Sequence, residues 1–366
     1  MSNDSISQKV MRLHNELRFW WHDLCRIAVA LYDPRDDMLS TFVSSSDGES
    51  PLVHYRARLA DVPSLKALAE QRQSRVIVDL EALRSPPSAH TQRLLQAGFR
   101  SSYSVPMYSP NGQLTGFLFF DANRAGYFDP SLTRHLDIYA ELLSALIQAE
   151  IAPVQTLSGA VFTAKRFTDL RDEETGAHLA RVAHYARLIA TNLADKHALD
   201  DEYIEFLYQF APLHDIGKIA IPDRILLSPA RLDAAQRRIM QTHVTRGLAI
   251  IDEMIGNFGL RNLDHVETLR DIVLRHHEQW DGGGYPDGLS GNDIPLAARI
   301  VSLADSFDAL LSTRPYKPAW THAKVKQHLR LQRGRKFDPD CVDALLQDET
   351  VLLAIREKYL DSATRH

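Results

Sequence analysis

The chain has 366 residues, of which 45% are hydrophobic and 24% charged, and its formal net charge at pH 7 is −5. The length favours two globular domains, and the charge gives no reason to expect binding to a nucleic-acid polymer. Cys25 and Cys341 form no CxxC unit, which excludes a cysteine-based zinc ribbon and fits a reducing compartment. The first residues lack an apolar signal segment, and no apolar run reaches about 18 residues. We therefore expect a cytoplasmic protein without a membrane segment.

The first 150 residues alternate between strand and helix patterns. Two β-rich runs, 25–33 and 38–46, are separated by the turn "PRDD". A helix is predicted over 64–73 and a strand over 74–80. Residues 101–122 read as two strands joined by an Asn-Gly hairpin at "SPNGQ".

This order of elements, an antiparallel sheet flanked by helices, resembles a GAF domain over residues 1–150. The resemblance implies a sensor or dimerisation domain with an unidentified small-molecule ligand. A generic α+β domain remains the alternative, because GAF domains carry no compact sequence motif.

From about Pro153 onward the pattern is helical, which predicts an all-α bundle over 151–366. A linker helix over about 130–165, interrupted near Pro153, is expected to join the two domains. Its apolar content predicts a homodimer.

Side chains that can bind metal recur in the apolar stripes of the second half, where eight of the sixteen histidines lie between His178 and His277. In residues 172–193 the stripe through Val182 reaches His178 and then Glu174 at steps of four residues. Burying either side chain requires a counter-charge, a hydrogen bond or a metal ion. Taken alone, this pair indicates a core histidine with an ordinary hydrogen-bond partner.

Four further helices show the same replacement of an apolar residue by a ligand type. The complete set contains five histidines and three carboxylates: Glu174, His178, His214, Asp215, His243, His276, His277 and Asp305. Eight ligands exceed the needs of one ion, so two or three divalent ions are expected, with Asp215 bridging. Imidazole and carboxylate without thiolate favour iron or manganese over zinc or nickel.

The motifs "HDIGK" at 214–218 and "HHEQWDGGGYP" at 276–286 resemble the HD-GYP subgroup of the HD phosphohydrolases, over about residues 160–350. The resemblance implies hydrolysis of cyclic di-GMP to the linear dinucleotide pGpG, and it implies the same eight residues as metal ligands. The presence of Glu174 implies a site able to hold three metals. GMP would follow as a second product if the third ion holds the terminal phosphate of pGpG.

Basic side chains are expected to complete a site for a phosphodiester. Lys218 is the first candidate, as a catalytic residue beside Asp215 and as a substrate contact. Arg314 and Lys317 match phosphate-contacting positions of the family, with a solvated loop as the alternative. Tyr285 is expected to stack on a guanine or to form a hydrogen bond within its turn.

The loop after the paired histidines carries further candidates. Glu278 is expected to orient an imidazole, with a surface glutamate as the alternative. Asp281 is expected to form an Asx-type turn. Gly282 and Gly284 permit positive φ angles and close backbone approach. Pro286 completes the GYP signature.

Two other functions stay open at this stage. The second domain could be a non-catalytic module that senses cyclic di-GMP or docks a signalling protein through the GYP loop. It could also hydrolyse another nucleotide, such as a different cyclic dinucleotide.

Overall fold

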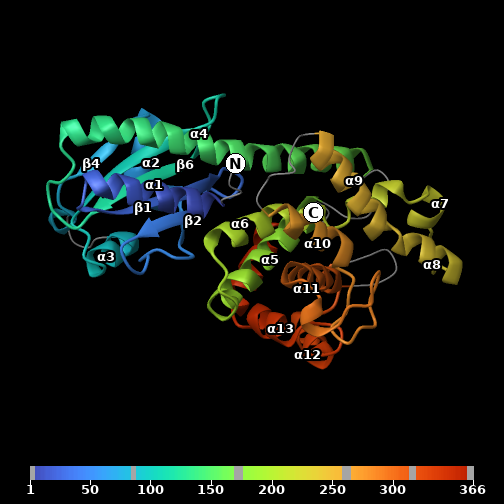
Figure 1. Cartoon of the computed structure of the whole chain (residues 1–366). Helices are drawn as coiled ribbons and strands as arrows, with labels where there is room; N and C mark the ends of the chain where they lie inside the picture. Colours follow the sequence, from blue (N-terminus) through green and yellow to red (C-terminus); the bar gives the residue numbers. More distant parts are fainter. Residues whose placement is uncertain (1–4, 84–87, 169–175, 258–264, 313–318, 361–366) are drawn as a thin grey trace. The chain divides into compact units, whose positions relative to one another are not determined.

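The computed structural model describes residues 5–83, 88–168, 176–257, 265–312 and 319–360 (Figure 1). The chain divides into two compact units, Met1–Ile151 with Asp200–Glu202, and Ala152–Leu199 with Tyr203–His366. Glu174, Arg314 and Lys317 lie outside the described residues. None of the described helices combines the length and apolar character needed to cross a membrane.

The first unit is built on a six-stranded antiparallel sheet with the strand order β3-β2-β1-β6-β5-β4. Its strands are β1 (Leu24–Asp33), β2 (Met38–Ser46), β3 (Arg56–Arg58), β4 (Arg75–Ile77), β5 (Ser101–Tyr108) and β6 (Leu114–Ala122). The central strand β1 carries the longest buried run, and most residues of its neighbour β6 are buried as well, as strands covered by a hydrophobic core should be.

Local sequence explains two strand boundaries. The predicted hairpin between β5 and β6 is confirmed: the Ser109 N–H donates to the Gln113 carbonyl at 2.9 Å, and Gly112 has a φ of 79°. The predicted strand 74–80 is too long, because β4 ends at Ile77. The Asp79 side chain accepts from the Glu81 N–H and begins a short 3₁₀ turn, η2 (Leu80–Ala82).

Helices flank this sheet: α1 (Ile6–Trp20), α2 (Pro63–Gln71), α3 (Ala89–Gln96) and the first part of α4 (Pro130–Thr168). A further 3₁₀ turn is η1 (Leu59–Asp61). The predicted interruption near Pro153 is wrong, because α4 continues through that residue as one helix (Figure 1). A proline removes one N–H donor, and a helix continues when buried neighbours such as Ile151 and Val154 offset that loss. The predicted α+β, GAF-like class of this unit is confirmed.

The described part of the second unit is helical, as predicted. It contains the helices α5 (Gly176–His197), α6 (Asp201–Phe210), α7 (Asp223–Leu226), α8 (Ala234–Gln241), α9 (His243–Asn257), α10 (Val266–Arg275), α11 (Leu296–Leu311), α12 (His322–Gln332), α13 (Pro339–Leu346) and α14 (Glu349–Lys358). Short 3₁₀ turns are η3 (Ala211–Leu213), η4 (Ile216–Ala220) and η6 (Gly291–Asp293). Helices α5 and α11 lie at the centre of this core, with most of their residues buried.

Most candidate ligands occupy helix ends and not the interiors of helices. His214 and Asp215 lie between η3 and η4, because Pro212 cannot continue the hydrogen bonding of α6. His243 begins α9 after a break at Thr242, whose hydroxyl donates to the Ile239 carbonyl at 2.6 Å. Backbone carbonyls inside a helix accept hydrogen bonds from the following turn, whereas carbonyls at a helix end are free to accept from other donors. Some of these end carbonyls accept hydrogen bonds from candidate ligands.

Candidate metal centre

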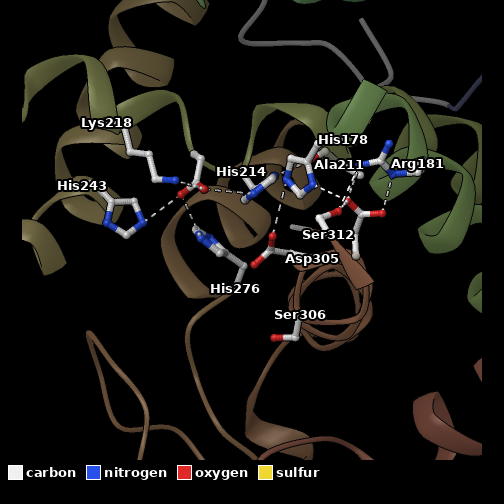
Figure 2. Close-up of polar contacts among 12 residues, drawn as sticks. His178, Arg181, Ala211, His214, Lys218, His243, His276, Asp305, Ser306 and Ser312 are labelled. Atoms are coloured by element: carbon white, nitrogen blue, oxygen red, sulfur yellow. Dashed lines mark hydrogen bonds and ion pairs between the residues drawn. The ribbon is translucent and has the colours of Figure 1, made fainter. Parts of the chain in front are cut away.

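The structure brings seven of the eight predicted ligands together in two groups. The ligand atoms within each group lie within 4.8 Å of one another: Asp215, His243, His276 and His277 in one group, and His178, His214 and Asp305 in the other. Figure 2 shows the imidazoles of His178, His214, His243 and His276 turned toward a common region. The eighth predicted ligand, Glu174, lies outside the described residues.

A close backbone contact sets Asp215 beside His243. A Cβ on Gly217 would lie 1.8 Å from the His243 carbonyl oxygen and 2.5 Å from the Gly247 nitrogen. Only glycine at 217 therefore lets η4 pack directly on the first turn of α9. The two ligands, far apart in sequence, are positioned by this contact between two backbones.

The orientation of three imidazoles is fixed by backbone carbonyls. The Nδ1 atom lies 2.8 Å from the Ala211 oxygen in His214, 2.8 Å from the Met240 oxygen in His243 and 2.9 Å from the Ile272 oxygen in His276. A carbonyl oxygen only accepts, so Nδ1 carries the proton in each neutral ring. The lone pair then belongs to Nε2, the atom that faces the cluster.

His178 is oriented by a side chain that the sequence reasoning missed. Its Nδ1 donates to Asp308 Oδ2 at 2.7 Å, and Asp308 also accepts from Arg181 Nε at 2.6 Å and Nη2 at 2.9 Å. Asp308 is completely buried, and the hydrogen bonds from His178 and Arg181 outweigh burial and lower its pKa. The available signal was spacing, since Asp308 follows Asp305 by three residues and Arg181 follows His178 by three.

The spacing between ligand atoms fits shared divalent ions. Asp215 Oδ1 lies 3.1 Å from His243 Nε2 and 3.5 Å from His276 Nε2, and all three atoms are buried without a hydrogen bond to any described residue. Asp215 Oδ2 lies 3.2 Å from His214 Nε2. Ligands bound to one ion at about 2.0–2.2 Å are separated by about 3 Å. The residues therefore fit a metal centre, with Asp215 between the groups as the expected bridge.

Both kinds of ligand are held in the protonation state that metal binding requires. Burial alone would raise the pKa of Asp215, but the charge of Lys218 and the contact with His214 hold it well below its usual range. Burial lowers the pKa of His276, against the opposing effect of Asp215, and it lowers the pKa of His277 strongly. Asp215 is thus an ionised carboxylate, and His276 and His277 are neutral imidazoles, at neutral pH.

Two predicted substrate residues lie at the edge of the cluster. Lys218 Nζ is 2.9 Å from Asp215 Oδ2, so this cation contacts the central carboxylate directly. The Tyr285 ring stacks on His277 with centroids 4.8 Å apart and an interplanar angle of 27°. Burial raises the pKa of Tyr285, so its phenol stays protonated. The Tyr285 ring therefore forms part of the wall of the site.

The GYP loop is organised by Glu278, whose role differs from the one expected. Its carboxylate is buried and accepts from the N–H groups of Asp287, Gly288 and Leu289, at 2.7, 3.1 and 3.0 Å, so it orders the loop instead of an imidazole. Asp281 Oδ1 accepts from the Gly283 N–H at 3.0 Å, which confirms the Asx-type turn.

The glycines of this loop serve two needs. Gly282 has a φ of 82°, and a Cβ on Gly284 would lie 2.4 Å from the Gln279 nitrogen. Pro286 is exposed at the end of the signature, after a cis peptide bond.

Comparisons with known proteins agree with this architecture. Residues 4–148 match the sequence model of the GAF domain and residues 167–341 match that of the HD domain. The chain is 41% identical over 232 residues to the cyclic di-GMP phosphodiesterase response regulator RpfG of Xanthomonas campestris, a match that covers 63% of this chain and 57% of that protein.

Two proteins of Vibrio cholerae are similar to the same extent. One is the 3′3′-cGAMP-specific phosphodiesterase 2, 40% identical over 207 residues that cover 57% of this chain and 38% of the relative. The other is a cyclic di-GMP phosphodiesterase, 38% identical over 230 residues that cover 61% of this chain and 46% of the relative. The chain thus spans about half the length of the curated relatives it matches.

Proposed function

Because this chain joins a GAF domain to an HD domain that carries the HD-GYP signature, we propose that it is a metal-dependent phosphodiesterase that hydrolyses cyclic di-GMP. The first product is the linear dinucleotide pGpG, and GMP follows if a third ion holds the terminal phosphate of pGpG. Iron or manganese is the proposed metal, ahead of zinc or nickel, because the ligand set is imidazole and carboxylate without thiolate.

The single observation that carries this proposal is the orientation of the imidazoles. In His214, His243 and His276 the backbone holds the Nδ1 proton, so the Nε2 lone pairs converge on Asp215. Lone pairs that face a carboxylate oxygen repel it unless a cation lies between them. A module that only bound a nucleotide would gain nothing from this arrangement.

Divalent ions held by these residues would make a water molecule nucleophilic near neutral pH and offset charge on the phosphoryl oxygens. The residues of the chain supply the rest of the site. Lys218 places a positive charge beside Asp215, where it can contact a phosphoryl oxygen. Tyr285, fixed against His277, presents a flat ring on which a guanine base can stack.

The decisive experiment combines elemental analysis of anaerobically purified protein with product analysis on cyclic di-GMP. We expect the purified protein to contain bound iron or manganese. It should convert cyclic di-GMP to pGpG, and if GMP forms, it should appear after pGpG. The variants Asp215→Ala and His276→Ala should lose metal and turnover together. The matched control His197→Ala removes a histidine outside the cluster and should keep both. Metal-replete protein without turnover would refute the proposal, and full activity in either ligand variant would refute the ligand assignment.

A second substrate is favoured by one observation, the 40% identity to a 3′3′-cGAMP-specific phosphodiesterase. We therefore propose a direct competition between cyclic di-GMP and 3′3′-cGAMP in equal amounts. Preferential loss of cyclic di-GMP supports the primary proposal. Preferential loss of 3′3′-cGAMP would show that 3′3′-cGAMP is the preferred substrate in place of cyclic di-GMP. The proposed metal centre is the same for both substrates.

We also propose that the first unit regulates the second through a bound small molecule. Its sheet borders a cavity of about 70 Å³ with mainly apolar walls and the buried pair of Arg26 and Asp121 on its lining. The expected observation is a change in phosphodiesterase turnover when a ligand of this cavity is added. A screen in which cavity ligands bind but turnover stays constant would contradict regulation by this route.

A further inference from the structure

A cavity of about 350 Å³ adjoins the metal-ligand cluster. His276, His277 and Asp305 form part of its lining, and Tyr285 lies on the same wall. Gln279 also lines it, and the rest comes from α11, α12 and the segment between α12 and α13. This volume is in the range of pockets that hold small-molecule ligands. Whatever binds at the cluster therefore has room to extend into this space.

Lys336 is the lysine of this cavity lining. Two backbone hydrogen bonds tie its segment to the residues that follow His277. The Trp280 N–H donates to the Lys336 carbonyl at 3.1 Å, and the Asp281 N–H donates to the Arg335 carbonyl at 2.8 Å. The backbone of Lys336 is consequently fixed relative to the ligand histidines.

Within the described residues, the charge of Lys336 is opposed by the Asp305 carboxylate only from beyond ion-pair distance. Its Nζ donates to Ser306 Oγ at 3.3 Å and lies 4.9 Å from the centre of the Phe337 ring, and within the described ranges no carboxylate comes within ion-pair distance of it. Lys218, in contrast, contacts Asp215 at 2.9 Å. The ammonium group is thus held by a neutral hydroxyl and by the face of the Phe337 ring, and neither contact supplies a counter-charge.

The two lysines lie on different sides of the cluster. Lys218 contacts Asp215 in one ligand group, whereas Lys336 contacts Ser306, which directly follows Asp305 of the other group. Figure 2 shows Lys218 and Ser306 well separated, with the ligand side chains between them. A cyclic dinucleotide carries two phosphodiesters on opposite sides of its ring. When one is at the metal centre, the other needs a cation beyond it.

We propose that Lys336, assisted by the Ser306 hydroxyl, binds the second, non-scissile phosphate of a cyclic dinucleotide while the first lies at the metal centre. This proposal rests on the proposed function and specifies how that site recognises its substrate. It makes Lys336 a specificity residue, because a substrate with a single phosphodiester gains nothing from it.

The test compares cyclic di-GMP with bis(4-nitrophenyl) phosphate, which has one phosphodiester. In Lys336→Gln we expect the ratio of kcat/KM for cyclic di-GMP to that for bis(4-nitrophenyl) phosphate to fall about tenfold or more, mainly through KM. Lys336→Arg should restore most of the ratio. Arg335→Gln, which removes the adjacent exposed cation, should change it less than about twofold.

Equilibrium binding of cyclic di-GMP to metal-loaded protein gives a readout apart from turnover, with about tenfold weaker binding expected in Lys336→Gln. An unchanged ratio in Lys336→Gln overturns the inference, whether both substrates are affected equally or neither is. Wild-type protein that hydrolyses only bis(4-nitrophenyl) phosphate, but binds cyclic di-GMP through Lys336, contradicts the proposed function and leaves the inference standing.

Discussion

Each unit of this protein buries a carboxylate beside basic side chains, but the two arrangements have opposite electrostatic character. In the first unit Asp121 contacts Arg26 at 2.5 Å, and both side chains are almost completely buried. Arginine is always protonated, so this pair is neutral as a whole. In the second unit Asp215 faces imidazole lone pairs as well as Lys218. The first pair balances its own charge within the chain, whereas the second cluster fits a cation from outside.

This contrast shows why burial of charge alone does not identify a functional site. Arg26 and Asp121 are more deeply buried than Asp305 or Lys218, yet they form an ordinary internal ion pair. The feature that separates the metal centre is the direction of the histidine protons. Where Nδ1 of a neutral imidazole donates to an acceptor, Nε2 can only accept, and several such atoms pointing at one carboxylate fit a metal ion between them.

The largest effect is expected from breaking the neutral pair. Asp121→Asn leaves the Arg26 guanidinium buried without its counter-charge, and removing one partner of a buried pair costs about 3–5 kcal/mol of unfolding free energy. Urea unfolding of the first unit measures this loss. Asp215→Asn in metal-free protein is the comparison, and it should cost less because Lys218 is partly exposed and water offsets the loss of its counter-charge. Equal costs would contradict the contrast between the two units.

A smaller effect is expected at Asp308, the side chain that orients the imidazole of His178. Asp308→Asn weakens the hold on His178 Nδ1 without touching a ligand atom, and such changes lower metal affinity or activity about 10–100-fold. Competition with a chelator measures the affinity. Asp343→Asn is a suitable control, because it weakens an exposed salt bridge to Arg333 and should leave metal affinity as it is. Wild-type affinity in Asp308→Asn would show that His178 needs no orienting partner.

The smallest effect concerns pH, because burial shifts the pKa of an imidazole in the second cluster. Burial, together with neighbouring His276, lowers the pKa of His277 in the folded state below the usual 6.5. The unfolded state therefore binds more protons below pH 6.5, so the unfolding free energy of metal-free protein falls as pH drops from 6.5 toward the folded pKa. The slope is at most about 1.4 kcal/mol per pH unit for one histidine. Urea unfolding of His277→Gln between pH 7 and pH 5 should show a shallower decline, and an unchanged slope would assign the effect to other groups.

Much of the architecture follows from sequence because its signals are local. The Asn-Gly hairpin, the central strands and the helices α5, α10 and α11 all follow from periodicity and turn chemistry. The seven described ligands could be selected from the sequence because each places a polar side chain where the apolar stripe of a helix predicts an apolar one. The same replacement recurs in several helices.

Other features depend on contacts between distant segments, which periodicity does not encode. Pro153 suggested a break that the helix does not have, and the breaks after Phe210 and at Thr242 were missed. Glu278 was assigned to an imidazole, although its partners are N–H groups of the following loop. Asp308 and Lys336 became visible only when the helices were packed, since their partners His178 and Ser306 lie far away in sequence.

The use of backbone carbonyls to aim three of the histidines has a consequence for how the centre tolerates mutation. The carbonyls of Ala211, Met240 and Ile272 persist whatever side chain those positions carry, so no single codon change can delete them. A designer could exchange these three residues among apolar types of similar size to adjust the surroundings of the ions without tilting a ring. Among the four ligand histidines whose Nδ1 partner lies in the described residues, His178 is the one oriented by a side chain, so Asp308 is where a substitution would disturb the aim of a ring.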